Sequence, residues 1–143
     1  MVRIFYFHLL LVALTTLFAF LTAVYLRKYY ISIPALIVFI TSVYFWSNTE
    51  EKTRMYIDII AVQLALYFSV YYAYSNMDAK KFRYYIIILA TALIYYLFAI
   101  LSWNLNPYIF DDNVKFYKTI TLILHSMGTF IANYSNILLY LSI

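Results

Sequence analysis

The sequence of 143 residues contains no cysteine, one glycine and two prolines, and only 11% of its residues are charged. The absence of cysteine excludes disulfide scaffolds, thiol redox sites and cysteine-based zinc sites. The single glycine, Gly128, excludes a glycine-rich phosphate-binding loop. The scarcity of charge excludes an ordinary soluble domain, in which about 25% of the residues are charged. Because 66% of the residues are hydrophobic, a disordered chain is excluded as well.

Five long runs of the sequence are free of Asp, Glu, Lys and Arg, and short polar connectors separate them. The runs cover residues 4–26, 29–49, 59–77, 84–110 and 119–143. A helix of about 20 apolar residues crosses a hydrocarbon core of roughly 30 Å, and each run is close to that length or longer. The runs do not alternate polar and apolar residues as the strands of a membrane barrel do, so they predict helices.

The sequence therefore predicts an all-α, polytopic membrane protein with five transmembrane helices in a compact bundle. In this interpretation the whole chain, residues 1–143, forms one transmembrane domain. The predicted spans are 4–26, 30–48, 56–76, 82–103 and 115–142. Several Tyr and Trp side chains flank the polar connectors, as expected for aromatic residues that favour the level of the lipid headgroups.

Polar and small residues fall on one face of the last predicted helix. The series at steps of 4, 4, 3 and 4 residues is His125, Thr129, Asn133, Asn136 and Tyr140. Gly128 and Ala132 lie beside this series as a pair of small residues four apart, which allows another helix to approach closely. The residues that we expect to mediate helix packing are Gly128, Thr129, Ala132, Asn133 and Asn136.

Each of the other runs has a comparable stripe that we expect to face protein. The stripe of the first run is His8, Thr15, Ala19 and Thr22. That of the second is Ser32, Ala35, Ser42 and Trp46. That of the third is Asp58, Ala61, Ala65, Ser69 and Ala73. The fourth run has a thinner stripe, which is Thr91, Tyr95 and Ser102.

Helices that alternate in direction bring His8, Asp58 and His125 to the same half of the bundle, on the side of the N-terminus. An ionisable residue inside a membrane is a functional-site hypothesis by default. Three interpretations are open. His125 and Asp58 could form hydrogen bonds that hold helices together, or they could form a proton relay. Alternatively, His8, Asp58 and His125 could bind Zn²⁺ and leave its fourth position to water. We predict that Asp58 and His125 approach each other.

The spacing of the polar residues also resembles a family of membrane hydrolases. Ser42 stands four residues before Trp46, Asp58 opens the next predicted span, and His125 stands four residues before Thr129. The alkaline-ceramidase type carries Ser-xxx-His, then Asp, then His-xxx-His on its last helix. Trp46 and Thr129 stand here in place of two of those histidines. The resemblance implies an alternative function, a small membrane-embedded lipid hydrolase or a decayed relative, with Ser42, Asp58 and His125 as catalytic residues.

The predicted function is a structural one. Since the chain has almost no mass outside its predicted spans, we expect an integral membrane subunit of a larger assembly, without a catalytic site, metal or cofactor of its own. The 18 Tyr and 12 Phe are typical of AT-rich coding sequence, which favours an organelle, a virus or an AT-rich microbe. Size and helix count are similar to those of the small membrane subunits of respiratory complex I. The expected host is therefore a respiratory-chain or ATP-synthase complex of the mitochondrial inner membrane.

The expected partners are other membrane subunits and lipids. The 10 Lys and Arg residues are grouped at the predicted membrane boundaries rather than on one shared face. The basic balance of the chain therefore gives no indication of nucleic-acid binding.

Overall fold

The computed structural model describes residues 2–47, 52–105 and 114–143, and these residues form five helices without any strand. The helices are α1 (Val2–Tyr25), α2 (Tyr29–Ser47), α3 (Lys52–Asn76), α4 (Ala79–Leu105) and α5 (Val114–Ser142). The prediction of an all-α chain with five helices in this order is confirmed. Each predicted span coincides with one helix to within a few residues, because the charged and polar connectors mark the helix ends.

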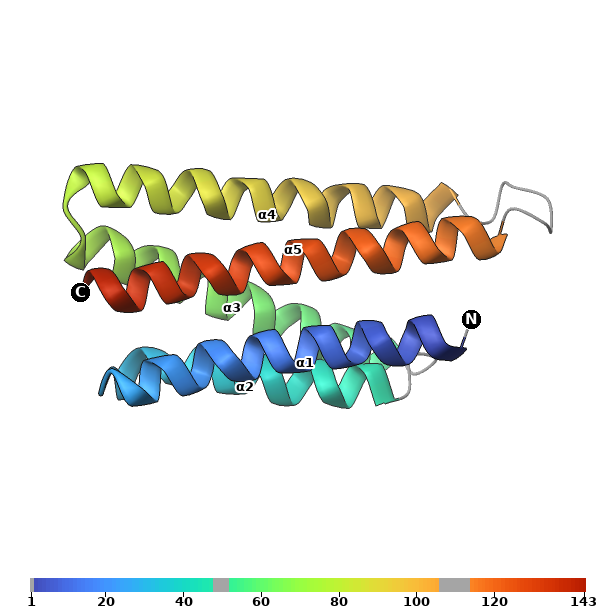
Figure 1. Cartoon of the computed structure of the whole chain (residues 1–143), viewed down its shortest axis with the longest axis horizontal. Coiled ribbons are helices and arrows are strands. Elements are labelled where there is room, and N and C mark those ends of the chain that lie inside the picture. The colour runs from blue at the N-terminus through green and yellow to red at the C-terminus, as the bar shows by residue number, and fades with distance from the viewer. Residues whose placement is uncertain (1, 48–51, 106–113) are drawn as a thin grey trace.

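The helices are packed in two pairs with α3 behind them (Figure 1). α4 and α5 lie side by side over most of their length, and α1 packs against both α5 and α2. α3 begins beside the end of α2 and runs obliquely to the start of α4. It packs mainly against α2 and makes little contact with α4. One broad side of α3 is therefore left without a neighbour within the bundle.

Small residues line the interior of the bundle, whereas large apolar residues cover its outside. Ala19, Ala23 and Ala73 are completely buried. Phe18 and Leu64, by contrast, are 62% and 66% exposed. A soluble protein buries its large apolar side chains, while helices in lipid pack through small residues and turn large ones to the hydrocarbon. The distribution of side chains is therefore that of an integral membrane protein.

Three of the described helices are long and apolar enough to cross a membrane. They are Tyr29–Ser47, Thr53–Asn76 and Ala79–Ser102. α1 contributes a shorter apolar stretch, Leu10–Tyr25. α5 carries the polar series that begins at His125, which lowers its mean hydropathy. These three candidate spans are consistent with an integral membrane protein. The crossing of the membrane by α1 and α5 is part of the proposed function.

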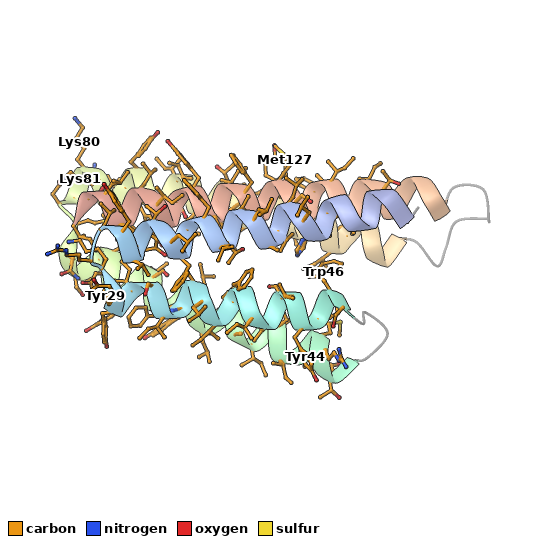
Figure 2. All side chains as sticks on the ribbon, turned by 60° about the horizontal axis from the view of Figure 1, so that its bottom comes forward. Tyr29, Tyr44, Trp46, Lys80, Lys81 and Met127 are labelled. Atoms are coloured by element: carbon orange, nitrogen blue, oxygen red, sulfur yellow. The ribbon has the colours of Figure 1, made fainter. Side chains whose placement is uncertain are left out.

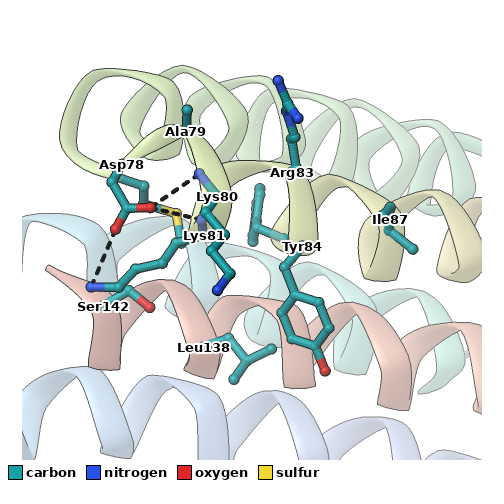
Figure 3. A pocket seen from close by; sticks show the side chains of 11 residues that line it. Asp78, Ala79, Lys80, Lys81, Arg83, Tyr84, Ile87, Leu138 and Ser142 are labelled. Atoms are coloured by element: carbon teal, nitrogen blue, oxygen red, sulfur yellow. Dashed lines mark hydrogen bonds and ion pairs between the residues drawn. The ribbon is translucent and has the colours of Figure 1, made fainter.

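Two helix ends on the side opposite the N-terminus have well-defined caps. α1 ends in a Schellman motif, in which the Lys28 amide donates to the Ala23 carbonyl over 2.8 Å and the Arg27 amide to Val24 over 2.9 Å. Asp78 caps the start of α4, where its carboxylate accepts hydrogen bonds from the Lys80 and Lys81 amides (Figure 3). These caps fix the turns that return the chain into the bundle.

Candidate functional site

Four aromatic side chains from four helices meet in the half of the bundle on the side of the N-terminus. His8 of α1 lies 4.4 Å from Trp46 of α2 and 5.1 Å from His125 of α5, measured between ring centroids. His125 also lies 5.3 Å from Trp46 and 5.2 Å from Tyr96 of α4. We call these four residues the histidine cluster. Figure 2 shows Trp46 on the side of α2 that faces the neighbouring helices.

The direction of the helices explains why these rings share one level. His8 and His125 stand near the beginnings of α1 and α5, whereas Trp46 is near the end of α2 and Tyr96 lies in the second half of α4. Successive helices run in opposite directions, so these positions come to similar depths. All four ring pairs meet edge to face, with interplanar angles between 63° and 73°. This is one of the geometries that aromatic rings prefer, because the positive edge of one ring faces the negative face of another.

The hydrogen bonds around His8 fix its tautomer. The Ser126 hydroxyl donates its proton to the Leu122 carbonyl over 2.9 Å. Its oxygen therefore accepts from His8 Nδ1, which lies 2.6 Å away, so Nδ1 carries the ring proton. His8 Nε2 is then a bare acceptor, and it is buried without a hydrogen-bond partner among the described residues. His125 Nδ1 is likewise buried without such a partner. The cluster thus holds two imidazole nitrogens with unused hydrogen-bonding capacity.

Asp58 makes its side-chain hydrogen bonds on the interface between α2 and α3. Its Oδ1 atom accepts hydrogen bonds from the Ser42 hydroxyl over 2.7 Å and from the Thr41 hydroxyl over 3.0 Å. Asp58 is 9% exposed, so the two hydroxyls solvate a carboxylate that has little access to water. No hydrogen bond joins Asp58 to His125. The structure therefore brings His8 and His125 together but gives Asp58 a different set of partners.

This arrangement bears on the two chemical alternatives for His8, Ser42, Asp58 and His125. A nucleophilic serine needs a base within hydrogen-bond reach, and the Ser42 hydroxyl donates to Asp58 while His125 contacts neither residue through a hydrogen bond. Among the residues that the structure describes, no three His, Cys, Asp or Glu side chains are close enough to hold one metal ion. His8, Asp58 and His125 therefore do not form the three-ligand site that was considered from the sequence.

The predicted packing face of α5 contacts two other helices. A Cβ atom at Gly128 would lie 3.3 Å from the Ala92 carbonyl oxygen, so α4 and α5 approach closely at this point. One turn from the cluster, the Thr129 hydroxyl lies 2.9 Å from the Tyr96 hydroxyl. Asn133 is buried and donates through Nδ2 to the Thr16 hydroxyl of α1 over 3.1 Å. Gly128, Thr129 and Asn133 all face protein rather than lipid.

The remaining two packing residues of α5 lie at the margin of this face. Ala132 and Asn136 are both half-buried. Asn136 makes no hydrogen bond with another described residue, in contrast to Asn133. The packing face of α5 is therefore centred on Gly128, Thr129 and Asn133.

The buried face of α4 is rotated relative to the stripe of residues that was predicted to face protein. Thr91 is exposed, and its hydroxyl donates to the Ile87 carbonyl within its own helix over 2.9 Å. The buried residues of α4 are Tyr85, Leu89, Ala92 and Ala99. Tyr96, which belongs to the histidine cluster, continues this series. It was not identified from the sequence as an inward-facing residue. The alternation of small and aromatic residues at steps of four and three was the available signal, but aromatic residues on every side of α4 obscured it.

No protein-family model, curated protein or solved structure matches the chain.

Proposed function

We propose that the chain is a five-span integral membrane protein that serves as a structural subunit of a larger membrane assembly. In this proposal α1 and α5 cross the membrane together with the three candidate spans. The support is geometric: α1 packs between α2 and α5, and α5 packs along α4, so both lie parallel to helices that are long and apolar enough to cross.

The observation that carries the proposal is that interior polar side chains form hydrogen bonds between neighbouring helices. Each side-chain hydrogen bond between helices links one pair of neighbours: His8 to Ser126 joins α1 to α5, Ser42 to Asp58 joins α2 to α3, and Tyr96 to Thr129 joins α4 to α5. Such bonds contribute on average about 0.6 kcal/mol each in a membrane. They join α1, α4 and α5 to one another and α2 to α3, and such fixed links suit a static subunit.

The outer surface offers a large area to partners and lipids. Only 11% of the residues in the most apolar stretch of α3 are buried, against 22% in α2 and α4. The exposed face of α3 carries Tyr67, Tyr71 and Tyr74, each more than 60% exposed. Tyr is enriched at protein–protein interfaces, because it combines a large apolar ring with a polar group. The composition of the chain favours an organellar host, and we propose a respiratory-chain or ATP-synthase complex of the mitochondrial inner membrane.

Native electrophoresis of solubilised membranes tests this proposal. The tagged chain, extracted in a mild detergent, should migrate with a defined complex much larger than its own 17.0 kDa. It should also retain the same set of polypeptides in stoichiometric amounts through purification. Migration at the mass of the isolated chain in several mild detergents would contradict the proposal.

A second candidate function rests on the histidine cluster. His8 Nε2 and His125 Nδ1 are both buried without a hydrogen-bond partner among the described residues. Such unpaired nitrogens suit a proton relay, in which further donors and acceptors contact the imidazoles only transiently. The test is proton flux into vesicles that contain the purified chain. Substitution of His125→Gln should abolish the flux if the cluster conducts protons, with Asn136→Gln as a control on the same helix. A flux equal to that of empty vesicles would remove this candidate.

A further inference from the structure

The outward face of α3 contains an uncharged polar side chain at the centre of a candidate membrane span. Gln63 is exposed and makes no hydrogen bond with any residue that the structure describes. It lies ten residues after Thr53, about 15 Å from that end of the helix at a rise of 1.5 Å per residue. Water is absent at this depth, so its amide has no partner unless another protein provides one.

An exposed polar side chain at a similar depth in α4 has a partner within its own helix. Thr91 of α4 is exposed as Gln63 is, but its hydroxyl donates to the Ile87 carbonyl. The Gln63 amide makes no such bond. Tyr67, one turn further along, is 75% exposed, and its hydroxyl makes no hydrogen bond with any described residue either. Two unpaired polar groups therefore lie next to each other on the same outward face.

The residues around Gln63 form a regular seam. Positions at alternating steps of 4 and 3 residues along the exposed side of α3 are Tyr56, Ile60, Gln63, Tyr67, Val70 and Tyr74. We call these six residues the α3 seam. All of them except Val70, which is half-buried, are exposed. Alternating steps of 4 and 3 residues are the spacing by which two helices remain in contact along their length, and a single polar residue within it fixes the register.

We propose that a second copy of this chain packs on the α3 seam, so that two α3 helices pair around Gln63. Copies inserted in the same orientation have parallel α3 helices, and a two-fold axis along the membrane normal brings each residue of the seam opposite itself. The Gln side chain is suited to this symmetry because its amide both donates and accepts hydrogen bonds. Two Gln63 side chains can donate to and accept from each other, which two side chains of like charge could not do.

The residues around the α3 seam are compatible with the α3 helix of a second copy. Asp58, the nearest charged residue on α3, is buried on the opposite side against α2, so no like charges meet across the two-fold axis. A shallow hollow lined by Tyr67, Val70, Tyr71, Tyr74 and Phe82 lies at one end of the seam. The aromatic side chains of a second copy can enter such a hollow. This inference deepens the proposed function by naming one partner, and it rests on α3 spanning the membrane.

Disulfide cross-linking gives a direct test, because the chain has no cysteine of its own. Ile60→Cys places the sole thiol on the seam. Ile94→Cys places it on the outer face of α4, where the exposed fraction is similar, 51% against 58%. With each variant reconstituted at low density in lipid vesicles, oxidation should yield covalent dimers of the Ile60→Cys variant and few of the Ile94→Cys variant. Equal yields would indicate random collision and overturn the proposal.

The role of the amide is tested by substitutions at Gln63 itself. Energy transfer between differently labelled copies in vesicles measures the mole fraction at which half of the chains are paired. Gln63→Leu should raise this value about tenfold, since an interhelical amide pair is worth about one order of magnitude in affinity, whereas Gln63→Asn should keep most of the association. The melting temperature of the bundle should be the same for both, because Gln63 has no partner inside it. Unchanged association of the Gln63→Leu variant would overturn the proposal.

The failure of this inference can be told apart from that of the proposed function. If the thiol of the Ile60→Cys variant cross-links in native membranes to a different polypeptide and not to a second copy, pairing through the α3 seam is overturned. The function as a subunit then stands. If the chain forms the covalent dimer but no larger complex, the proposed function fails and pairing of the two copies stands.

Discussion

At the scale of single residues, two interior hydroxyl groups are used in the same way. The hydroxyls of Thr16 and Ser126 each donate to the carbonyl four residues earlier and accept a hydrogen bond from a neighbouring helix. Thr16 donates to Val12 and accepts from Asn133. Ser126 donates to Leu122 and accepts from His8. In both cases the proton is paired within its own helix, and the oxygen serves as an acceptor for the neighbouring helix.

The link between Asn133 and Thr16 should be measurable as a coupling energy. A double-mutant cycle of Asn133→Ala and Thr16→Val, followed by unfolding in a denaturing detergent, should give a coupling of about 0.6 kcal/mol and at most about 1.7 kcal/mol. The same cycle with Asn136→Ala provides the control, since Asn136 makes no hydrogen bond with another described residue. Strictly additive effects of Asn133→Ala and Thr16→Val would show that the two side chains do not interact.

The close approach of α4 and α5 at Gly128 predicts a different sensitivity to added volume. Gly128→Val should lower the free energy of unfolding by about 1–3 kcal/mol, because the rigid Ala92 carbonyl and the Tyr95 side chain leave no room for it. Met127→Val, at an exposed position one residue earlier, should change it by less than about 0.5 kcal/mol. Similar losses for the two variants would mean that the helices do not pack through Gly128.

At the scale of the helices, the sequence determines the ends and most of the inward faces. Charged connectors such as Arg27-Lys28 mark the ends, because charge is costly in hydrocarbon. Where an inward face carries polar or small residues, its orientation was predicted correctly, as for Asp58 and Ala73 of α3. α4 has few polar residues, so an apolar inward face and an apolar lipid-facing side look alike there. The placement of Thr91 on the inward face was wrong for that reason.

The end of α1 contains a residue in an unfavourable conformation. Arg27 has a φ of 58°, in the left-handed region that a Schellman motif requires and that a side chain disfavours. Arg27→Gly should therefore raise the free energy of unfolding by about 1 kcal/mol. Arg27→Ala is the matched control, as it removes the same charge but keeps the strained backbone. A gain in stability for both variants would point to the charge and not to the conformation.

The cap of α4 predicts a dependence of stability on pH. Hydrogen bonds from the Lys81 and Lys80 amides, together with the nearby Lys81 side chain, lower the pKa of Asp78 from its ordinary value of 3.8. Because the pKa is lower in the folded state, Asp78 stabilises the fold above pH 3.8, and this contribution is lost as the pH falls through the depressed pKa. Melting temperatures of Asp78→Asn, which retains a capping side chain, should match those of the wild type at neutral pH and fall less steeply in acid. Parallel acid profiles would exclude Asp78 as the source.

At the scale of the whole molecule, the sequence does not reveal which helices become neighbours. The depth of a residue within the bundle could be predicted from its position along its helix. This prediction correctly placed His8 and His125 at one level. The hydrogen-bond partners of Asp58 could not be predicted, because they depend on the packing of α3 on α2. There the hydroxyls of Thr41 and Ser42, and not a histidine, donate to its carboxylate. The composition of the histidine cluster likewise follows from the packing of α4 against α5, which brings Tyr96 to His125.

The crossing of the membrane by α1 and α5 can be tested on the intact chain by the side from which introduced thiols are labelled. Since the chain has no cysteine, Arg3→Cys and Arg27→Cys each provide a sole thiol at one end of α1. An impermeant maleimide applied to sealed, oriented vesicles should label these two variants from opposite sides. Lys118→Cys and Ser142→Cys should behave in the same way for α5.

Packing within the bundle gives the physical reason for this expectation. Lys28 donates to the main-chain oxygen of Ile143 over 2.7 Å, which holds the end of α1 and the end of α5 at the same surface of the bundle. From that surface both helices run along neighbours that cross the membrane, so the other ends of α1 and α5 have to emerge on the far side. If both thiols flanking α1 reacted from one side, α1 would lie along the membrane surface. Its hydrogen bonds to α5 through His8 and Thr16 could then not form, and the five-helix arrangement would be incorrect.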